Sequence, residues 1–97
     1  MFKSYINMSS ILKLEDLLKQ PGWDTRKRIL EELKMGSKNA YELSKTLDLN
    51  YSSVKYHIEL LQKFGLIKAE KKGRRFYYAL TKNGTILLLE NVKSDSP

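Results

Sequence analysis

The chain of 97 residues contains no cysteine. Disulfide bonds, thiolate metal sites and thiol catalysis are therefore excluded. No apolar run approaches the roughly 18 residues that a membrane span requires. The stretch from Met1 to Ser10 also lacks the apolar region of a signal peptide. Together these absences predict a cytoplasmic protein with no membrane segment.

Histidine is almost as scarce, since His57 is the only one. A catalytic nucleophile–histidine–acid set could use no other histidine, and the sequence contains neither a phosphate-binding loop nor a metal-ligand spacing. A lone histidine on the inward side of an amphipathic helix is more often a packed, hydrogen-bonded residue than a ligand or a base. The sequence therefore predicts a protein that is not an enzyme and that has no metal site and no cofactor.

Acidic residues are outnumbered: 18 Lys and Arg stand against 11 Asp and Glu, which gives a net charge of +7. A basic excess on a small domain indicates a polyanionic partner, either nucleic acid or an anionic membrane. Net charge alone is equally compatible with a solvated surface that promotes solubility. The length allows one domain, which we take as residues 1–97.

The apolar spacing predicts helices in the first two thirds of the chain. Residues 9–35 hold two N-terminal helices, at 9–19 and at 25–34, and Asp24 is placed to cap the second. Residues 39–64 hold two more. Asn39 opens the first of these with Glu42 as the far half of a capping box, and Asn50 opens the second.

The period changes to that of strands after Gly65, which ends the last of these helices. Residues 66–71 and 75–80 form a predicted β-hairpin around Gly73, within a wing at 66–80. Thr81 then caps a predicted C-terminal helix at 81–93, despite Gly84 within it, and residues 94–97 are expected to be a disordered tail. The fold class is α+β and mostly helical.

Two short helices within residues 40–61 satisfy the requirements of a helix-turn-helix, in which the second helix lies in the major groove of DNA. The outward side of that second helix carries short hydroxyls, an aromatic ring and cations, which reach base edges and phosphates. Among these residues we predict that the DNA-binding contacts of the recognition helix come from Ser52, Ser53, Lys55 and Tyr56.

The predicted hairpin concentrates the basic charge, because residues 65–80 carry +4 of the total +7. Lys72, Arg74 and Arg75 flank Gly73 at its tip, where cations suit DNA phosphates or a narrow minor groove. We therefore predict that these three residues form a DNA-binding wing. The alternative is a charged edge hairpin that only resists aggregation.

These features resemble the arsenic-repressor-like (ArsR) branch of winged helix-turn-helix regulators over residues 36–80, about half of the chain. The matching stretches are Asn39-Ala40-Tyr41-Glu42-Leu43-Ser44, Val54-Lys55-Tyr56-His57-Ile58-Glu59-Leu60-Leu61, Gly65-Leu66-Ile67 and Gly73-Arg74-Arg75-Phe76-Tyr77-Tyr78-Ala79-Leu80-Thr81. The resemblance implies a winged helix-turn-helix with terminal dimerisation helices. It also implies a homodimer that binds an imperfect palindrome of double-stranded DNA, usually as a repressor.

The chain departs from this family in two respects. Asp48 stands where the family usually has glycine in the turn, and aspartate adopts the left-handed conformation at modest cost. The metal-sensing members use a cysteine pair or clusters of His and carboxylates, whereas this chain has no cysteine and only Glu90 on its last predicted helix. The resemblance therefore implies no metal sensing and leaves any small-molecule effector unknown.

The last predicted helix contains four consecutive apolar residues, Ile86, Leu87, Leu88 and Leu89. They cover nearly every direction around a helix, so that some would stay exposed in a monomer of this size. We predict a dimer interface formed by these four residues and by the N-terminal stripe of Ile11, Leu14 and Leu18. The alternative is a terminal helix wholly buried on its own domain.

Two other functions remain open. A winged helix can serve as a protein–protein interaction module within a transcription or chromatin assembly, although such modules usually lack a basic wing together with a cationic recognition helix. RNA binding is disfavoured because a recognition helix does not fit the deep, narrow groove of A-form RNA.

Overall fold

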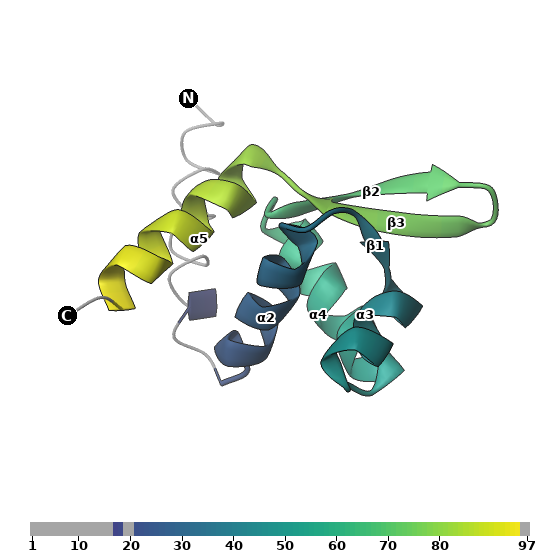
Figure 1. The fold of residues 1–97 in the computed structure, drawn as a ribbon, viewed down its shortest axis with the longest axis horizontal. Helices are drawn as coiled ribbons and strands as arrows, with labels where there is room; N and C mark the ends of the chain where they lie inside the picture. The colour runs from purple at the N-terminus through teal and green to yellow at the C-terminus, as the bar shows by residue number, and fades with distance from the viewer. Residues whose placement is uncertain (1–16, 19–20, 96–97) are drawn as a thin grey trace, which may run out of the picture.

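The computed structural model describes residues 17–18 and 21–95. The elements follow the order α2 (Trp23–Leu33), β1 (Lys38–Asn39), α3 (Ala40–Leu47), α4 (Tyr51–Lys63), β2 (Ile67–Lys72), β3 (Arg75–Leu80) and α5 (Lys82–Asp95). The strands form one antiparallel sheet in the order β1–β3–β2. In Figure 1 the β2–β3 hairpin extends to one side of helices α2–α4, and α5 lies toward the opposite side. The predicted class, α+β and mostly helical, is confirmed.

Side chains fix the two helix starts that the sequence predicted for the helix-turn-helix. Asn39 and Glu42 form a complete capping box: the Asn39 side chain accepts from the Glu42 N–H at 2.8 Å, and the Glu42 side chain accepts from the Asn39 N–H at 2.9 Å. The Asn50 side chain accepts from the N–H groups of Ser52 and Ser53 at 2.8 and 3.3 Å. Between the two helices, Asp48 takes the left-handed conformation at φ 55°. The turn is therefore set by local chemistry.

One core joins the helices to the sheet. Its buried members come from every described helix and from β2 and β3, and they are Leu17, Ile29, Leu30, Leu33, Ala40, Leu43, Val54, Ile58, Leu61, Leu66, Ile67, Tyr78 and Leu88. Trp23 is partly buried and packs against this core. Because α4 buries Val54, Ile58 and Leu61, its opposite side is left facing outward.

The start of α2 differs from the prediction. Asp24 was expected to cap this helix, but the helix begins at Trp23 and the cap position is Gly22, which has no side chain to form a capping hydrogen bond. The first helical hydrogen bond runs from the Arg26 N–H to the carbonyl of Gly22, which places Asp24 inside the first turn. An acidic residue there still favours the positive end of the helix dipole.

Strand β1 was not predicted. Its two residues, Lys38 and Asn39, pair with Tyr78 and Tyr77 of β3. A two-residue strand has no alternation of polar and apolar residues to reveal it. It nevertheless ties the start of α3 to the hairpin, which places the helix-turn-helix beside the wing.

The hairpin has the predicted turn, with its first strand shifted by one residue. Its first strand is Ile67–Lys72, where residues 66–71 were expected, and Lys72 pairs with Arg75. Gly73 and Arg74 form the two-residue loop, with φ 63° at Gly73. Glycine adopts this positive φ without steric penalty, which favours a tight hairpin turn.

Helix α5 begins at the predicted cap but extends further than expected. The Thr81 hydroxyl oxygen accepts from the Gly84 N–H at 3.1 Å. The helix continues to Asp95, so Ser94 and Asp95 are helical where a disordered tail was predicted. Residues 85–96 contain neither glycine nor proline, so no residue there breaks the helix at the predicted end, Lys93. Residues 96–97 lie outside the described part of the chain.

The structure explains why a glycine, Gly84, lies within α5, which the sequence did not. A Cβ atom at this position would clash with the carbonyl oxygen of Leu66, and would also crowd a methyl group of Leu80. The Thr81 N–H donates to that same Leu66 carbonyl at 3.1 Å. Glycine is therefore required where α5 crosses the backbone just before β2.

Candidate nucleic-acid interface

Helix α4 presents the outward face that the sequence predicted. Successive helical residues turn by about 100°, so Ser52 and Tyr56 lie opposite the buried Val54 and Ile58. Ser52 and Ser53 are exposed, and Tyr56 is 59% exposed. These three side chains are thus available at the N-terminal half of α4, the part of a recognition helix that contacts base edges.

Lys55 differs from the other three predicted residues of this helix. It is half-buried, and it lines a cavity between α4 and the hairpin instead of the outermost surface. The cavity brings Lys55 together with Arg74 and Arg75, which come from the wing. The structure thus joins the two sets of predicted DNA contacts at one place.

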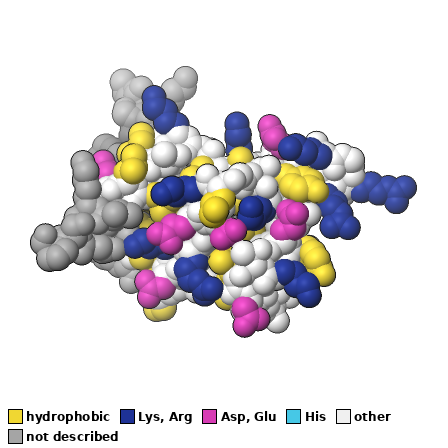
Figure 2. Space-filling view, viewed as in Figure 1, with side chains coloured by type: hydrophobic (Ala, Val, Ile, Leu, Met, Phe, Trp, Pro, Cys, Tyr) yellow, Lys and Arg dark blue, Asp and Glu magenta, His cyan; other side chains and the backbone are white. Residues whose placement is uncertain are grey.

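The wing cations are all exposed. Lys72, Arg74 and Arg75 lie at and beside the hairpin loop. The Lys72 Nζ sits 5.4 Å from the centroid of the Tyr77 ring, a cation–π distance. Lys and Arg side chains gather at the hairpin end of the molecule in Figure 2. The wing therefore presents a cationic surface beside the outward face of α4.

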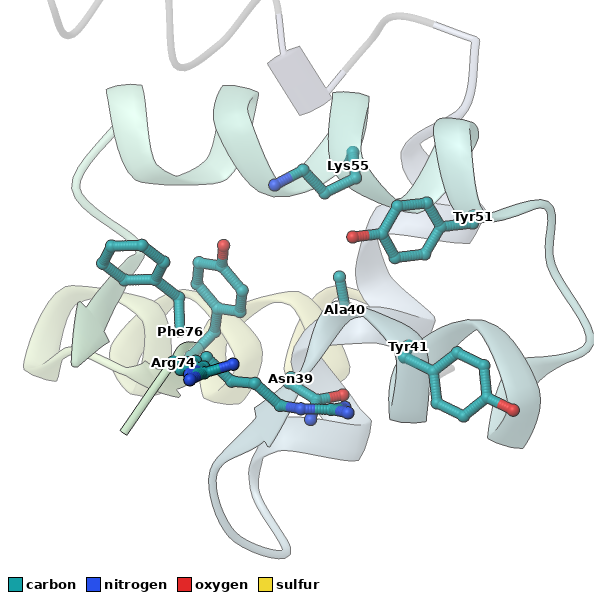
Figure 3. Close-up of a pocket in the computed structure, with 9 residues that line it drawn as sticks. Asn39, Ala40, Tyr41, Tyr51, Lys55, Arg74 and Phe76 are labelled. Carbon is teal, nitrogen blue, oxygen red and sulfur yellow. The ribbon is translucent and has the colours of Figure 1, made fainter. Parts of the chain in front are cut away.

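We call the cavity between α4, the start of α3 and β3 the wing cleft. Its volume is about 280 Å³, and its walls carry four aromatic residues, Tyr41, Tyr51, Phe76 and Tyr78. Lys55 and Tyr51 project from α4 on one side of this space, with Arg74 and Phe76 on the other, whereas the Tyr41 ring is directed away (Figure 3). The other lining residues are Asn39, Ala40 and Arg75.

The sequence did not single out the aromatic residues of the wing cleft. Tyr51 and Phe76 are about half exposed, yet each lies beside a predicted contact: Tyr51 precedes Ser52, and Phe76 follows Arg75. That adjacency was a usable signal. Their shared position depends on the packing of β3 against the helix-turn-helix, which pattern alone does not give.

A buried arginine lies beneath α4. Arg26 of α2 is only 2% exposed, and its Nη1 lies 3.0 Å from Nδ1 of His57 on α4. Its Nη2 donates to the carbonyl of Pro21 at 3.2 Å, and its Nε has no hydrogen-bond partner in the structure as described. His57 is thus packed and hydrogen-bonded, as predicted, through a partner that the sequence did not indicate.

This contact fixes the protonation of His57. A guanidinium only donates, so Nδ1 of His57 must accept and the neutral imidazole carries its proton on Nε2. Burial, followed by the charge of Arg26, lowers the pKa of His57. Burial also lowers the pKa of Arg26, an effect that Tyr56 partly opposes. The pair is therefore a neutral imidazole held against a buried cation.

The residues predicted for a dimer interface differ in exposure. Ile86 and Leu89 are 42% and 59% exposed, and Leu87 is half-buried. Leu88 is only 3% exposed and belongs to the core of the single chain, because one side of α5 must pack on its own domain. Leu18 is helical and half-buried, whereas Ile11 and Leu14 lie outside the described residues.

Residues 17–18 and 21–95 contain no group of three or more His, Cys, Asp or Glu that could hold a metal ion. In the same residues, no helix combines the length and apolarity needed to cross a membrane.

Residues 19–95 match the model of the winged helix-turn-helix family. The chain belongs to this family. The predicted winged helix-turn-helix fold, with the hairpin as its wing, is thereby confirmed. A solution structure from Mycobacterium bovis shares that fold, with a TM-score of 0.79 and 20% identity, over 94% of this chain and 83% of the other. That neighbour, Mb0332, is described as a homodimeric DNA-binding domain and a possible ArsR-family transcriptional regulator.

Two curated relatives are also regulators. The transcriptional repressor SdpR of Bacillus subtilis is 32% identical over 65% of this chain and 68% of its own length. An uncharacterised helix-turn-helix transcriptional regulator of Methanocaldococcus jannaschii, MJ1398, is 28% identical over 62% of this chain, which spans only 15% of that longer protein. The described winged helix is thus a DNA-binding transcription-regulator domain, and it is not an enzyme.

Proposed function

We propose that this protein is a cytoplasmic, sequence-specific transcription repressor that binds palindromic double-stranded DNA as a homodimer. The observation that carries the proposal is the joining of two surfaces: the exposed N-terminal half of α4 and the cationic hairpin lie on either side of the wing cleft. Such a surface pairs a helix for the major groove with cations for the backbone.

Within this surface we assign different roles to the predicted contacts. Ser52, Ser53 and Tyr56 contact base edges, because they are exposed on α4. Lys55 is half-buried, across the wing cleft from Arg74, and contacts the phosphate backbone where it passes between helix and wing. Lys72 and Arg75 contact phosphates or the minor groove next to the hairpin.

The homodimer is supported by the apolar surface of α5. Ile86 and Leu89 are exposed in the single chain, and an exposed apolar pair on a terminal helix is stabilised by burial against a second copy. The predicted complement is the N-terminal stripe that includes Leu18. The homodimeric state described for the Mycobacterium bovis neighbour agrees with this arrangement. A two-fold dimer presents two recognition helices, which suits a palindromic site.

Selection from a pool of random duplex DNA, at a stated salt concentration, tests the proposal. We expect enrichment of a motif with two inverted half-sites whose centres lie about one helical turn, or a multiple of it, apart. Binding with no enriched motif would show that the protein binds DNA without sequence specificity. An absence of binding at low salt would instead favour a protein–protein interaction module.

A further inference from the structure

We propose that the wing cleft is a binding site for a small aromatic anion, a single-ring carboxylate or phosphate ester, and that this ligand excludes DNA. The first part is independent of the proposed function, and the second part rests on it. The claim concerns a cavity of about 280 Å³ bounded by α4, the start of α3 and β3.

The charge of the cleft selects an anion. Three cations line it, Lys55 from α4 and Arg74 and Arg75 from the wing, and none of the nine lining residues is acidic. Each arginine presents planar donors that match a carboxylate or phosphate, and lysine adds a point charge. An anion placed between Lys55 and Arg74 therefore relieves the mutual repulsion of these cations.

The walls of the cleft favour an aromatic ring attached to that anion. Tyr51 faces the space from α4, and Phe76 lies on its other side, beside Arg74 (Figure 3). Tyr78, which is buried, and Ala40 complete the wall between them. A DNA phosphate needs donors but gains little from aromatic walls, whereas a flat ring packs against them.

The size of the cleft limits the ligand. Pockets for small molecules span roughly 300–1,000 Å³, so this cleft falls just below that range. Its volume suits one ring with an anionic substituent and is too small to enclose a drug-sized molecule. The small side chain of Ala40 leaves this space open at the start of α3.

Such a ligand would regulate DNA binding by direct competition. Lys55, Arg74 and Arg75 line the cleft and are also the cations that we assign to the DNA backbone. An anion held there neutralises them and occupies the path between α4 and the wing. By linkage, ligand and DNA then weaken each other by the same factor.

The first experiment needs no DNA. The 97-residue chain is titrated with phenyl phosphate and benzoate, with inorganic phosphate and cyclohexanecarboxylate as probes that lack the aromatic ring, and binding is followed by amide chemical shifts. We expect saturable shifts at Tyr51, Lys55 and Phe76, and binding of phenyl phosphate about tenfold tighter than that of inorganic phosphate. Equal affinity for phenyl phosphate and inorganic phosphate overturns the proposal, because the site then binds small anions and the aromatic ring adds nothing to the affinity. An absence of saturable binding by either aromatic probe also overturns it.

Matched variants locate the site. Lys55→Met should weaken phenyl phosphate by about tenfold or more. Lys63→Met removes the same charge from the far end of α4, outside the cleft, and should change the affinity less than twofold.

The aromatic wall is tested in the same way. Phe76→Ala should weaken the binding of the aromatic probes but not that of inorganic phosphate, while Met35→Ala, at another exposed apolar residue, should leave both affinities unchanged. Equal effects of Lys55→Met and Lys63→Met would contradict the assignment, and thermal unfolding verifies that each variant is folded.

The second experiment adds the selected duplex. Phenyl phosphate at ten times its dissociation constant should raise the apparent dissociation constant of DNA about tenfold, whereas inorganic phosphate at the same ionic strength should not. If the affinity for DNA is unchanged with the ligand bound, the claim that the ligand excludes DNA is wrong, while the claim that the ligand binds in the wing cleft is unaffected. If the ligand-free protein binds no duplex, the proposed function is wrong, and the titration without DNA still tests whether the wing cleft binds the ligand.

Discussion

Arg26 and His57, 31 positions apart in the chain, meet at 3.0 Å between Nη1 and Nδ1. The contact joins the first turn of α2 to the middle of α4, directly behind Tyr56, whose ring lies edge-to-face with the imidazole at 5.4 Å between centroids. The position of the recognition helix therefore depends on a histidine that stays neutral.

The first prediction concerns the titration of His57. Burial and the charge of Arg26 lower its pKa in the folded state, while in the unfolded chain it stays near 6.5. The unfolded chain therefore binds more protons as the pH falls below about 7, and the free energy of unfolding decreases from there down to the pKa of the folded state. Because His57 is the only histidine, its single imidazole C2–H resonance reports this titration directly. A pKa of 6.5 or above in the folded protein would contradict the contact.

The Arg26→Met variant separates the two causes. It removes the charge but keeps an apolar chain of similar length, so the pKa of His57 should rise toward 6.5 without reaching it, since burial remains. The Arg28→Met variant removes a neighbouring exposed arginine that donates to the Leu47 carbonyl, and it should leave the pKa of His57 unchanged. Equal shifts in the two variants would mean that Arg26 has no specific effect.

The second prediction concerns the glycine within α5, Gly84, whose replacement by alanine should destabilise the protein. Replacing a helical glycine by alanine usually stabilises by about 1 kcal/mol. Gly84→Ala should instead lower the free energy of unfolding by about 1–3 kcal/mol, because its Cβ would clash with the Leu66 carbonyl. The exposed neighbour Asn83→Ala should change stability by no more than about 0.5 kcal/mol. Urea unfolding measures both, and a stabilised Gly84→Ala protein would show that α5 does not cross there.

The elements that could be predicted from sequence are those set by local chemistry. The Asn39–Glu42 capping box, the Asn50 cap and the Gly73 turn each depend on residues within four positions of one another. The features that were missed depend on distant parts of the chain: the Arg26–His57 contact, the approach of Gly84 to Leu66 and the wing cleft. Strand β1 was missed because two residues carry no periodicity.

The third prediction assigns base reading to α4. Replacing Tyr56 or Ser53 with alanine should change the preferred DNA sequence, at about 1–3 kcal/mol for each lost base contact. Arg74→Ala, at the hairpin loop, should instead weaken all duplexes by a similar factor. Binding of each variant to a library of single-base changes in the selected site distinguishes the two patterns. A uniform loss for Tyr56→Ala and Ser53→Ala would assign these residues to the backbone.

The fourth prediction concerns the apolar surface of α5. A charge at Leu89, which is exposed in the single chain, should disrupt a homodimer without disturbing the core, so Leu89→Glu should shift sedimentation equilibrium toward monomer at micromolar concentration. Thr46→Glu adds the same charge at an exposed position of α3, outside the proposed interface, and should leave the dimer intact. A monomer mass for the parent protein in the same measurement would contradict the proposed dimer.

The most direct test of the DNA-binding surface is the salt dependence of binding to the selected duplex. Each phosphate contact contributes about 0.9 to the slope of log K against log salt. Replacing Lys72, Arg74 and Arg75 with alanine removes up to three such contacts in each protomer, so the slope should flatten by several units while the protein stays folded. Lys34→Ala with Lys82→Ala, two exposed lysines outside the wing, should leave the slope close to that of the parent. If the triple variant binds with the parent's salt dependence, the basic hairpin is not part of the DNA-binding surface.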